Sequence, residues 1–246
     1  MSDLYTNTGD GTCSITSQSS WADARDHSGS GGTVLTSSSL SGAALGVNRS
    51  ATRGGGSAYA VYRAFMYFDT SGITGTVSSA TIKIYGTSSN DGSAIAVKST
   101  AFGGDGGTAL AATDLNNIVG FSSGSSLAGL ATDYSAAITT TGYSTSGYND
   151  FTGTADLRAD MQNNNVVIIC FMDYTNDYLN SALTSNGFLN YGAYFTDNTG
   201  TDKDPYIEYE VAAAGYTHDV NSVAAASIGK VNSVATASIG KINSVD

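Results

Sequence analysis

The 246-residue chain has little proline, cysteine, histidine or glutamate. Its two cysteines, Cys13 and Cys170, are too few and too far apart for a disulfide framework or a zinc motif, so we expect two buried free thiols. Of the 21 acidic residues only Glu208 and Glu210 are glutamates, and the other 19 are aspartates, which favour turns over helices. This composition excludes a mainly helical fold.

Positive charge is also scarce, with 10 Lys and Arg against 21 Asp and Glu and a net charge of −11. An acidic surface repels phosphates, so no nucleic-acid partner is expected. The longest apolar stretch, 166–172, is too short to cross a bilayer. The N-terminus has neither a basic region nor an apolar run. We therefore expect no membrane partner, no signal peptide and synthesis as a soluble cytoplasmic product.

Catalytic and metal-binding patterns are absent as well. The two histidines, His27 and His218, lie near no nucleophile elbow and in no metal-ligand spacing. The many aspartates form accidental pairs, none of which has a defined place in a fold. Acids in 173–177 and 201–205 have a spacing that suits Ca²⁺, but we interpret them as turn-forming residues. The chain is predicted to be no enzyme and to use no cofactor and no metal.

Glycine, tyrosine, serine and threonine are abundant, with 30 Gly, 15 Tyr and 41% hydrophobic residues overall. This composition favours short strands and polar loops around a sizeable core. Many short strands with turn signals between them, and no helix–strand alternation, predict an all-β fold, either a β-sandwich or a jelly roll. Strands are expected at 58–69, 77–86, 93–100, 165–174, 187–197 and 204–211, and a strand followed by turns is expected in 133–150. A helix is expected at 154–163. A helical turn capped by Thr113 or Asp114 is expected in 113–120.

Periodicity predicts how these strands are buried. The strand at 58–69 is apolar on both faces, which is typical of a central strand. The strands at 77–86 and 204–211 alternate and are expected to be half-buried. The residues expected on their inner faces are Ala80, Ile82, Ile84, Ile207, Tyr209 and Val211.

Four regions are expected along the chain. The sandwich core spans 58–211 and ends at its last alternating strand. A polar N-terminal segment, 1–57, is expected to pack on the sandwich through its single tryptophan, Trp21. Residues 212–218 form a hinge, and 219–246 form a tail.

The tail is an eleven-residue repeat: VNSVAAASIGK at 220–230, VNSVATASIGK at 231–241 and the start of a third copy. On a helix, eleven residues return to nearly the same face, which would align the valines and isoleucines. Gly229 and Gly240 oppose a helix, whereas Asn-Ser between two valines suits a tight turn, so we slightly favour extended strands.

Two and a half copies cannot bury their own apolar side, so the tail is expected to dock on sister subunits or on another protein. A disordered linker is the alternative. The predicted assembly residues are Val220, Val223, Ile228, Val231, Val234, Ile239, Ile242 and Val245.

The segment 62–86 resembles a β-sandwich domain of tailed-phage and marine-virus structural proteins, itself distantly similar to DNRLRE-type wall-associated modules and carbohydrate-binding modules. The motif is an arginine (Arg63), a strand ending in Phe-Asp, a turn and a Ser-Ala-Thr that begins the next strand. The segments 19–26, 140–151 and 204–211 resemble other parts of that domain, whereas the middle, 101–120, does not match it. The resemblance implies a β-sandwich and a virion context, and it supplies no catalytic residue.

Exposed tyrosines are the candidate glycan-binding residues, because β-sandwich modules stack sugars on aromatic rings. Tyr143, Tyr148, Tyr191 and Tyr194 lie in or near turn-rich segments. Tyrosines in strands also pack in cores and interfaces, and we prefer that structural interpretation.

Our leading hypothesis is a non-enzymatic virion structural protein: a capsid decoration protein, a head fibre or a tail accessory protein. It would attach to other virion proteins, or form a homo-oligomer with sister subunits, through its repeats. The alternative is a carbohydrate-binding module that recognises a host surface glycan. A third hypothesis, a bacterial cell-surface or matrix protein, is weakened by the missing signal peptide.

Overall fold

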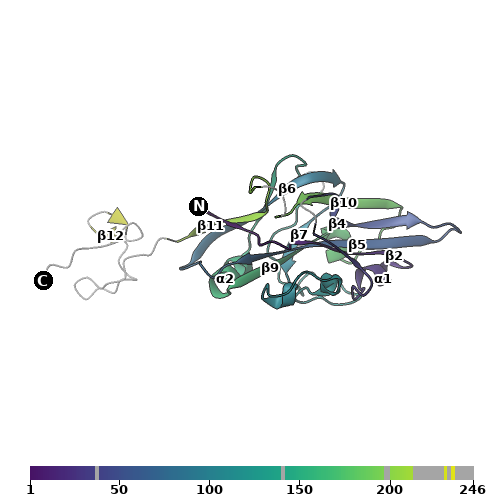
Figure 1. Cartoon of the computed structure of the whole chain (residues 1–246), viewed down its shortest axis with the longest axis horizontal. Coiled ribbons are helices and arrows are strands. Elements are labelled where there is room, and N and C mark those ends of the chain that lie inside the picture. The colour runs from purple at the N-terminus through teal and green to yellow at the C-terminus, as the bar shows by residue number, and fades with distance from the viewer. Residues whose placement is uncertain (37–38, 140–141, 197–199, 213–229, 232–233, 236–246) are drawn as a thin grey trace.

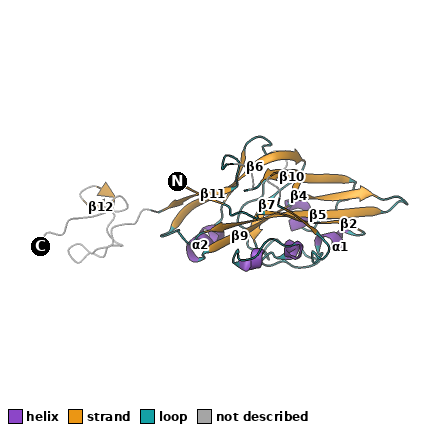
Figure 2. Ribbon diagram, viewed as in Figure 1, coloured by secondary structure: helices purple, strands orange, loops and turns teal. Residues whose placement is uncertain are grey.

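Strands dominate the secondary structure of the computed structural model (Figure 1, Figure 2). The structure describes residues 1–36, 39–139, 142–196 and 200–212, together with the pairs 230–231 and 234–235. Antiparallel pairing joins eleven strands into one continuous sheet that folds into layers. The prediction of an all-β sandwich is confirmed. The strands are β1 (Ser2–Tyr5), β2 (Gly11–Gln18), β3 (Thr33–Leu35), β4 (Ser39–Ala51), β5 (Ser57–Asp69), β6 (Val77–Asn90), β7 (Ile95–Lys98), β8 (Tyr148–Thr152), β9 (Val166–Met172), β10 (Gly187–Tyr194) and β11 (Tyr206–Val211).

The strands form two layers. One, which we call sheet A, has the order β1-β11-β6-β8. The other, sheet B, has the order β3-β2-β5-β9-β7. The strands β4 and β10 connect the layers, because β10 pairs with both β6 and β4, and β4 pairs with β5. Sheet A therefore has one face turned toward sheet B and one turned away from it.

Sheet B is buried on both faces. Toward sheet A, Phe68 and Phe171 pack with Ile82 and Ile207 in the first hydrophobic core. On its other face, Phe65 packs in a second core, which is covered by loops and short helices. Its strands β5 and β9 therefore contribute to both cores, as the apolar pattern of 58–69 predicts. The segment 101–120, which matches nothing in the resemblance, supplies Phe102, Leu110, Leu115 and Ile118 to the second core.

Residues 1–57 form part of both layers. The strand β1 pairs with β11 in sheet A, and β2 and β4 pair with β5. This segment looked weakly patterned because serine, threonine and glycine carry little hydrophobic signal. At Gly46, where φ is +152°, a Cβ atom would lie 2.3 Å from the carbonyl oxygen of Leu189 in β10. Glycine therefore lets β4 approach its neighbour closely.

The helices are short: α1 (Trp21–Arg25), α2 (Ala155–Asn163), the 3₁₀ turns η1 (Phe102–Gly104) and η2 (Ala112–Asn116), and the π-type turn η3 (Tyr174–Tyr178). The predicted helix at 154–163 is confirmed as α2, with Thr154 Oγ1 accepting a hydrogen bond from Leu157 N. The predicted turn in 113–120 begins earlier, so the predicted caps Thr113 and Asp114 are wrong: both lie inside η2, the N-cap is Ala111, and Asp114 accepts a hydrogen bond from Ala111 N. No described helix has the length and apolar character that a bilayer span requires.

Three details of burial and pairing test the sequence patterns. Ala80, Ile82, Ile84 and Ile207 are buried, and Tyr209 packs against the first core, as predicted. Val211, expected inward, is 39% exposed, because the β11–β6 register shifts between Glu210 and Val211. Within 133–150, the described residues form isolated bridges rather than a strand until β8 begins.

Candidate functional site

A row of tyrosines follows the outer face of sheet A and its junction with β10. In β6, β8 and β11 the residues next to these tyrosines are buried, and strand alternation turns the tyrosines outward. None of them belongs to either hydrophobic core. The members of this tyrosine row, in order of contact, are Tyr5, Tyr206, Tyr148, Tyr85 and Tyr194.

Each ring of the tyrosine row contacts the next. The distances between ring centroids are 5.4 Å for Tyr5 and Tyr206, 5.1 Å for Tyr206 and Tyr148, 5.3 Å for Tyr148 and Tyr85, and 5.6 Å for Tyr85 and Tyr194. Three of the four contacts are edge-to-face, with interplanar angles of 79–81°. This geometry pairs the positive edge of one ring with the negative face of the next and holds the rings in place.

A lysine and a turn fix one end of the row. Lys203 Nζ lies 4.6 Å from the ring centroid of Tyr194 and 5.4 Å from that of Tyr85, within range of cation–π attraction. Tyr148 Oη donates a hydrogen bond to the carbonyl oxygen of Asp204, at 3.1 Å. The turn that precedes β11 is therefore bound to the row through its backbone and its one lysine.

Charged side chains flank the row on the same face. Lys83 Nζ lies 3.0 Å from both carboxylate oxygens of Asp150 and 3.7 Å from Glu208 Oε2. Partial burial lowers the pKa of Lys83, but the contacts with Asp150 and Glu208 outweigh burial and raise it above its ordinary value. One ammonium thus faces two carboxylates on this face.

Two hydroxyl groups of the row, those of Tyr148 and Tyr206, have raised pKa values. Burial raises the pKa of Tyr148 above its ordinary value, and the neighbouring Tyr206 adds to the shift. Burial also raises the pKa of Tyr206, against the opposing effect of Lys83. Tyr85 Oη donates a hydrogen bond to Ser146 O at 2.8 Å. The row therefore presents ring surface together with hydroxyl groups that form hydrogen bonds.

The structure separates the four tyrosines predicted from the sequence. Tyr148 and Tyr194 belong to the row. Tyr143 and Tyr191 are buried and stack on each other at 3.9 Å with an interplanar angle of 6°, inside the first core. Their hydroxyl groups donate to the carbonyl oxygens of Gly192 and Gly92. For these two the glycan hypothesis is corrected, because the core encloses the faces on which a sugar would stack.

Sequence reasoning missed Tyr5, Tyr85, Tyr206 and Lys203. A signal existed for two of them, because Tyr85 and Tyr206 lie on the polar face of strands whose alternation was recognised. Tyr5 gave no signal, since its short strand is defined by pairing with β11. The contact of Lys203 with two rings depends on the fold of the turn before β11.

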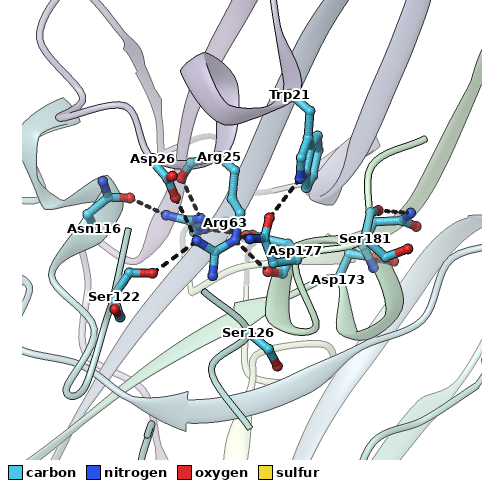
Figure 3. Close-up of polar contacts among 12 residues, drawn as sticks. Trp21, Arg25, Asp26, Arg63, Asn116, Ser122, Ser126, Asp173, Asp177 and Ser181 are labelled. Atoms are coloured by element: carbon cyan, nitrogen blue, oxygen red, sulfur yellow. Dashed lines mark hydrogen bonds and ion pairs between the residues drawn. The ribbon is translucent and has the colours of Figure 1, made fainter. Parts of the chain in front are cut away.

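A second polar cluster, around Arg63, is buried (Figure 3). Arg63 Nε and Nη2 donate to the two carboxylate oxygens of Asp177, each at 2.7 Å. Its remaining N–H groups bind Asn116 Oδ1 and the carbonyl oxygens of Leu115 and Arg25. All five donors of this guanidinium are therefore satisfied inside the protein.

Arg25 completes this cluster from α1. Its Nε donates to the carbonyl oxygen of Asp177 and its Nη1 binds Asp26 at 2.6 Å. Both guanidinium groups lie over the ring of Phe121, at 5.1 and 5.2 Å. Burial lowers the pKa of Arg63, but the carboxylate of Asp177 outweighs it and holds that pKa above its ordinary value. The cluster joins α1, β5, the covering loops and η3, which is a structural role.

Trp21 and Asp173 strengthen the same region. Trp21 is 8% exposed, and its Nε1 donates to Asn180 Oδ1 at 2.9 Å, so it anchors α1 on the segment after η3. Asp173 accepts hydrogen bonds from Asn176 N and from the backbone and hydroxyl of Ser93. Burial raises the pKa of Asp173 despite these bonds. The acids in 173–177 thus bind protein donors, as expected of turn-forming residues.

The remaining polar candidates are the two cysteines and the two histidines. Cys13 and Cys170 are buried and free, and burial raises the pKa of Cys13 to about 12. His27 Nδ1 accepts a hydrogen bond from Gly29 N, and His218 lies outside the described residues. No three His, Cys, Asp or Glu side chains among the described residues come together as metal ligands.

A hollow of about 610 Å³ lies beside α2 and is lined by polar groups that include Lys98, Tyr134 and Asn164. These three donate to Asp160, at 2.9, 2.6 and 2.8 Å. These three lining groups are therefore engaged by Asp160, which links α2 to Lys98 of β7 in sheet B.

Two residue pairs of the tail are described. The strands β12 (Lys230–Val231) and β13 (Val234–Ala235) pair antiparallel, with Val231 opposite Val234. The chain is extended at these four positions. The other predicted assembly residues, Val220, Val223, Ile228, Ile239, Ile242 and Val245, lie outside the described residues.

Comparison with protein-family models and with curated proteins identifies no relative of the chain.

Proposed function

We propose that the chain is a non-enzymatic structural protein of a virion, a decoration, fibre or tail accessory protein whose sandwich is displayed and whose repeats attach it. The observation that carries the proposal is the position of the two ends of the sandwich. The strand β1 pairs with the last strand, β11, and Ser2 lies opposite Tyr209 (Figure 1). The sandwich therefore begins and ends at one edge, and the β4–β5 hairpin lies at the opposite end.

The described part of the sandwich has its own hydrophobic cores. Among the described residues, both hydrophobic cores are built from residues between Cys13 and Ile207. Ala212 is the last described residue of the sandwich, and its N–H donates to Thr76 O at 2.7 Å. The repeats follow later in the sequence and carry valine and isoleucine at fixed spacing, which supports a role in attachment to sister subunits or other virion proteins.

Light scattering on the full chain and on a tail variant tests the proposal. Replacing Val231 and Val234 by aspartate should leave the melting temperature of the sandwich unchanged and abolish self-association or binding to the particle. The control replaces Ser222 and Ser233, polar positions of the same repeats, by aspartate and should assemble as the parent chain does. If the valine variant assembles normally, or if the parent chain neither self-associates nor binds a particle, attachment through the repeats is wrong.

A further inference from the structure

The outer face of sheet A differs from both faces of sheet B. Loops and short helices cover the outer face of sheet B and enclose the second core. On sheet A, no described strand or helix packs over the tyrosine row as a third layer; Tyr5 is 38% exposed, and the other four tyrosines are partly exposed. Folding does not require large aromatic side chains at solvent-facing strand positions. A contiguous set of them indicates an interaction surface.

The composition of this face narrows the chemistry of the partner. Aromatic rings alternate with hydrogen-bonding groups: Asp150 is well exposed and Glu208 partly so, and both lie beside the row. A pyranose ring has an apolar face of C–H groups and a rim of hydroxyls. The tyrosine rings match the apolar face, and the carboxylates accept hydrogen bonds from the hydroxyls.

The charge of the face determines which sugars fit. Asp3 lies opposite Glu208 in the β1–β11 register, so a further carboxylate borders the row. Lys83 is already paired with two acids, Lys203 lies against the rings of Tyr85 and Tyr194, and the whole chain carries a net charge of −11. Sulfated, phosphorylated or carboxylated glycans would be repelled. The face therefore favours a neutral sugar.

The shape of the row favours a chain of sugars over a single one. Its five rings form one contact series with steps of 5.1–5.6 Å, each comparable to the length of one sugar unit. Because most neighbouring rings are nearly perpendicular, an oligosaccharide that stacks on the face of one ring meets the edge of the next, so several sugar units can contact the series. The edge-to-face packing keeps the rings ordered before binding, which lowers the entropic cost of association.

We propose that the tyrosine row is a binding site for a neutral oligosaccharide. Tyr5, Tyr206 and Tyr148 provide the platform, and Asp150 and Glu208 accept hydrogen bonds from sugar hydroxyls. Lys203 holds the rings of Tyr85 and Tyr194 in place. The inference rests on the sandwich alone and holds whether or not the repeats attach the chain to a virion.

Binding of the full chain to an array of neutral and acidic oligosaccharides tests this proposal. Affinity electrophoresis then measures binding in gels that contain soluble glucan, mannan or xylan, with the acidic polysaccharide alginate for comparison. We expect retardation by at least one neutral polysaccharide and none by alginate. Tyr5→Ala with Tyr206→Ala should weaken that binding at least tenfold, and Tyr5→Phe with Tyr206→Phe should retain it. The matched control is Tyr62→Ala, a partly buried tyrosine of β5 that contacts Phe188 outside the row.

Several outcomes would overturn the proposal: no neutral glycan bound on the array, binding of acidic glycans only, or undiminished binding by the double alanine variant. Loss of binding by Tyr62→Ala to the same extent would mean that the site lies elsewhere. Melting temperatures of all variants identify any loss that is due to unfolding. A protein partner in place of a sugar would appear as a blank array and would likewise refute the proposal.

Discussion

Replacing Arg63 by methionine is expected to lower the free energy of unfolding by about 3–5 kcal/mol, the cost typical of removing one partner from a buried ion pair. Arg63 and Asp177 both have fully buried side chains and share two hydrogen bonds of 2.7 Å. Methionine fills much of the same volume, so the change removes charge and donors while leaving little cavity. The prediction therefore concerns the polar network rather than packing.

The structure indicates where the cost arises. Without Arg63, the carboxylate of Asp177 loses both short contacts and, among the described side chains, keeps Arg25 Nε, at 3.7 Å. The carbonyl oxygens of Leu115 and Arg25 lose their donors as well. Domains of this kind are stable by about 5–15 kcal/mol in total, so the loss is a large share of the whole. At roughly 2–4 °C per kcal/mol, the melting temperature should fall by about 6–20 °C.

Urea unfolding followed by the fluorescence of Trp21 measures this loss, because the buried indole becomes exposed when the network opens. A double-mutant cycle with Asp177→Leu isolates the pair: the double variant should be more stable than the sum of the single losses predicts. The control is Lys83→Met, which removes a surface ion pair and should cost no more than about 1 kcal/mol. A loss for Arg63→Met as small as that of the control, or additive losses in the cycle, would refute the reasoning.

Two further predictions concern the core and α2. Tyr191→Ala should lower the free energy of unfolding in urea by about 3–5 kcal/mol, because it removes a fully buried ring. Tyr5→Ala should have a smaller effect, because that ring lies at the surface. Equally small losses for the two variants would contradict the assignment of Tyr191 to the core and Tyr5 to the surface. Burial raises the pKa of Asp160, but hydrogen bonds from Lys98 and Tyr134 outweigh it and hold that pKa below its ordinary 3.8. The ionised Asp160 therefore stabilises the fold fully at pH values above 3.8, and this stabilisation is lost as the pH falls through the lowered pKa of the folded protein. The gap in urea midpoint between the parent chain and Asp160→Asn should shrink from neutral to strongly acidic pH, and a constant gap would show that charge plays no part.

Some of the candidate site could be predicted from residues alone. The alternation of 77–86 and 204–211 places Tyr85 and Tyr206 on the face away from Ile84 and Ile207, and the structure confirms that both isoleucines are buried. Period-two alternation is a local property of the chain, so it can be recognised in the sequence without knowledge of the neighbouring strands. It does not say which strands become neighbours.

Other parts of the site depended on contacts between distant residues. Tyr143 and Tyr148 are five positions apart in similar surroundings, yet one stacks in the core on Tyr191 and the other joins the row. Local sequence does not distinguish them, because burial depends on the elements that pack against each ring. The same holds for Arg63, whose partners Asp177 and Leu115 lie 114 and 52 residues away.

The sequence by itself determined the fold class, the central strand at 58–69, the helix α2 and the free state of both cysteines, since composition, periodicity and capping act over short distances. Only the tertiary structure decided that residues 1–57 are strands of the sandwich, that two buried arginines join its covering loops, and that five tyrosines from five strands form one surface. Each of these outcomes requires residues that are far apart in the chain to come together. That proximity comes from strand pairing and the burial of two cores, which no short stretch of sequence contains.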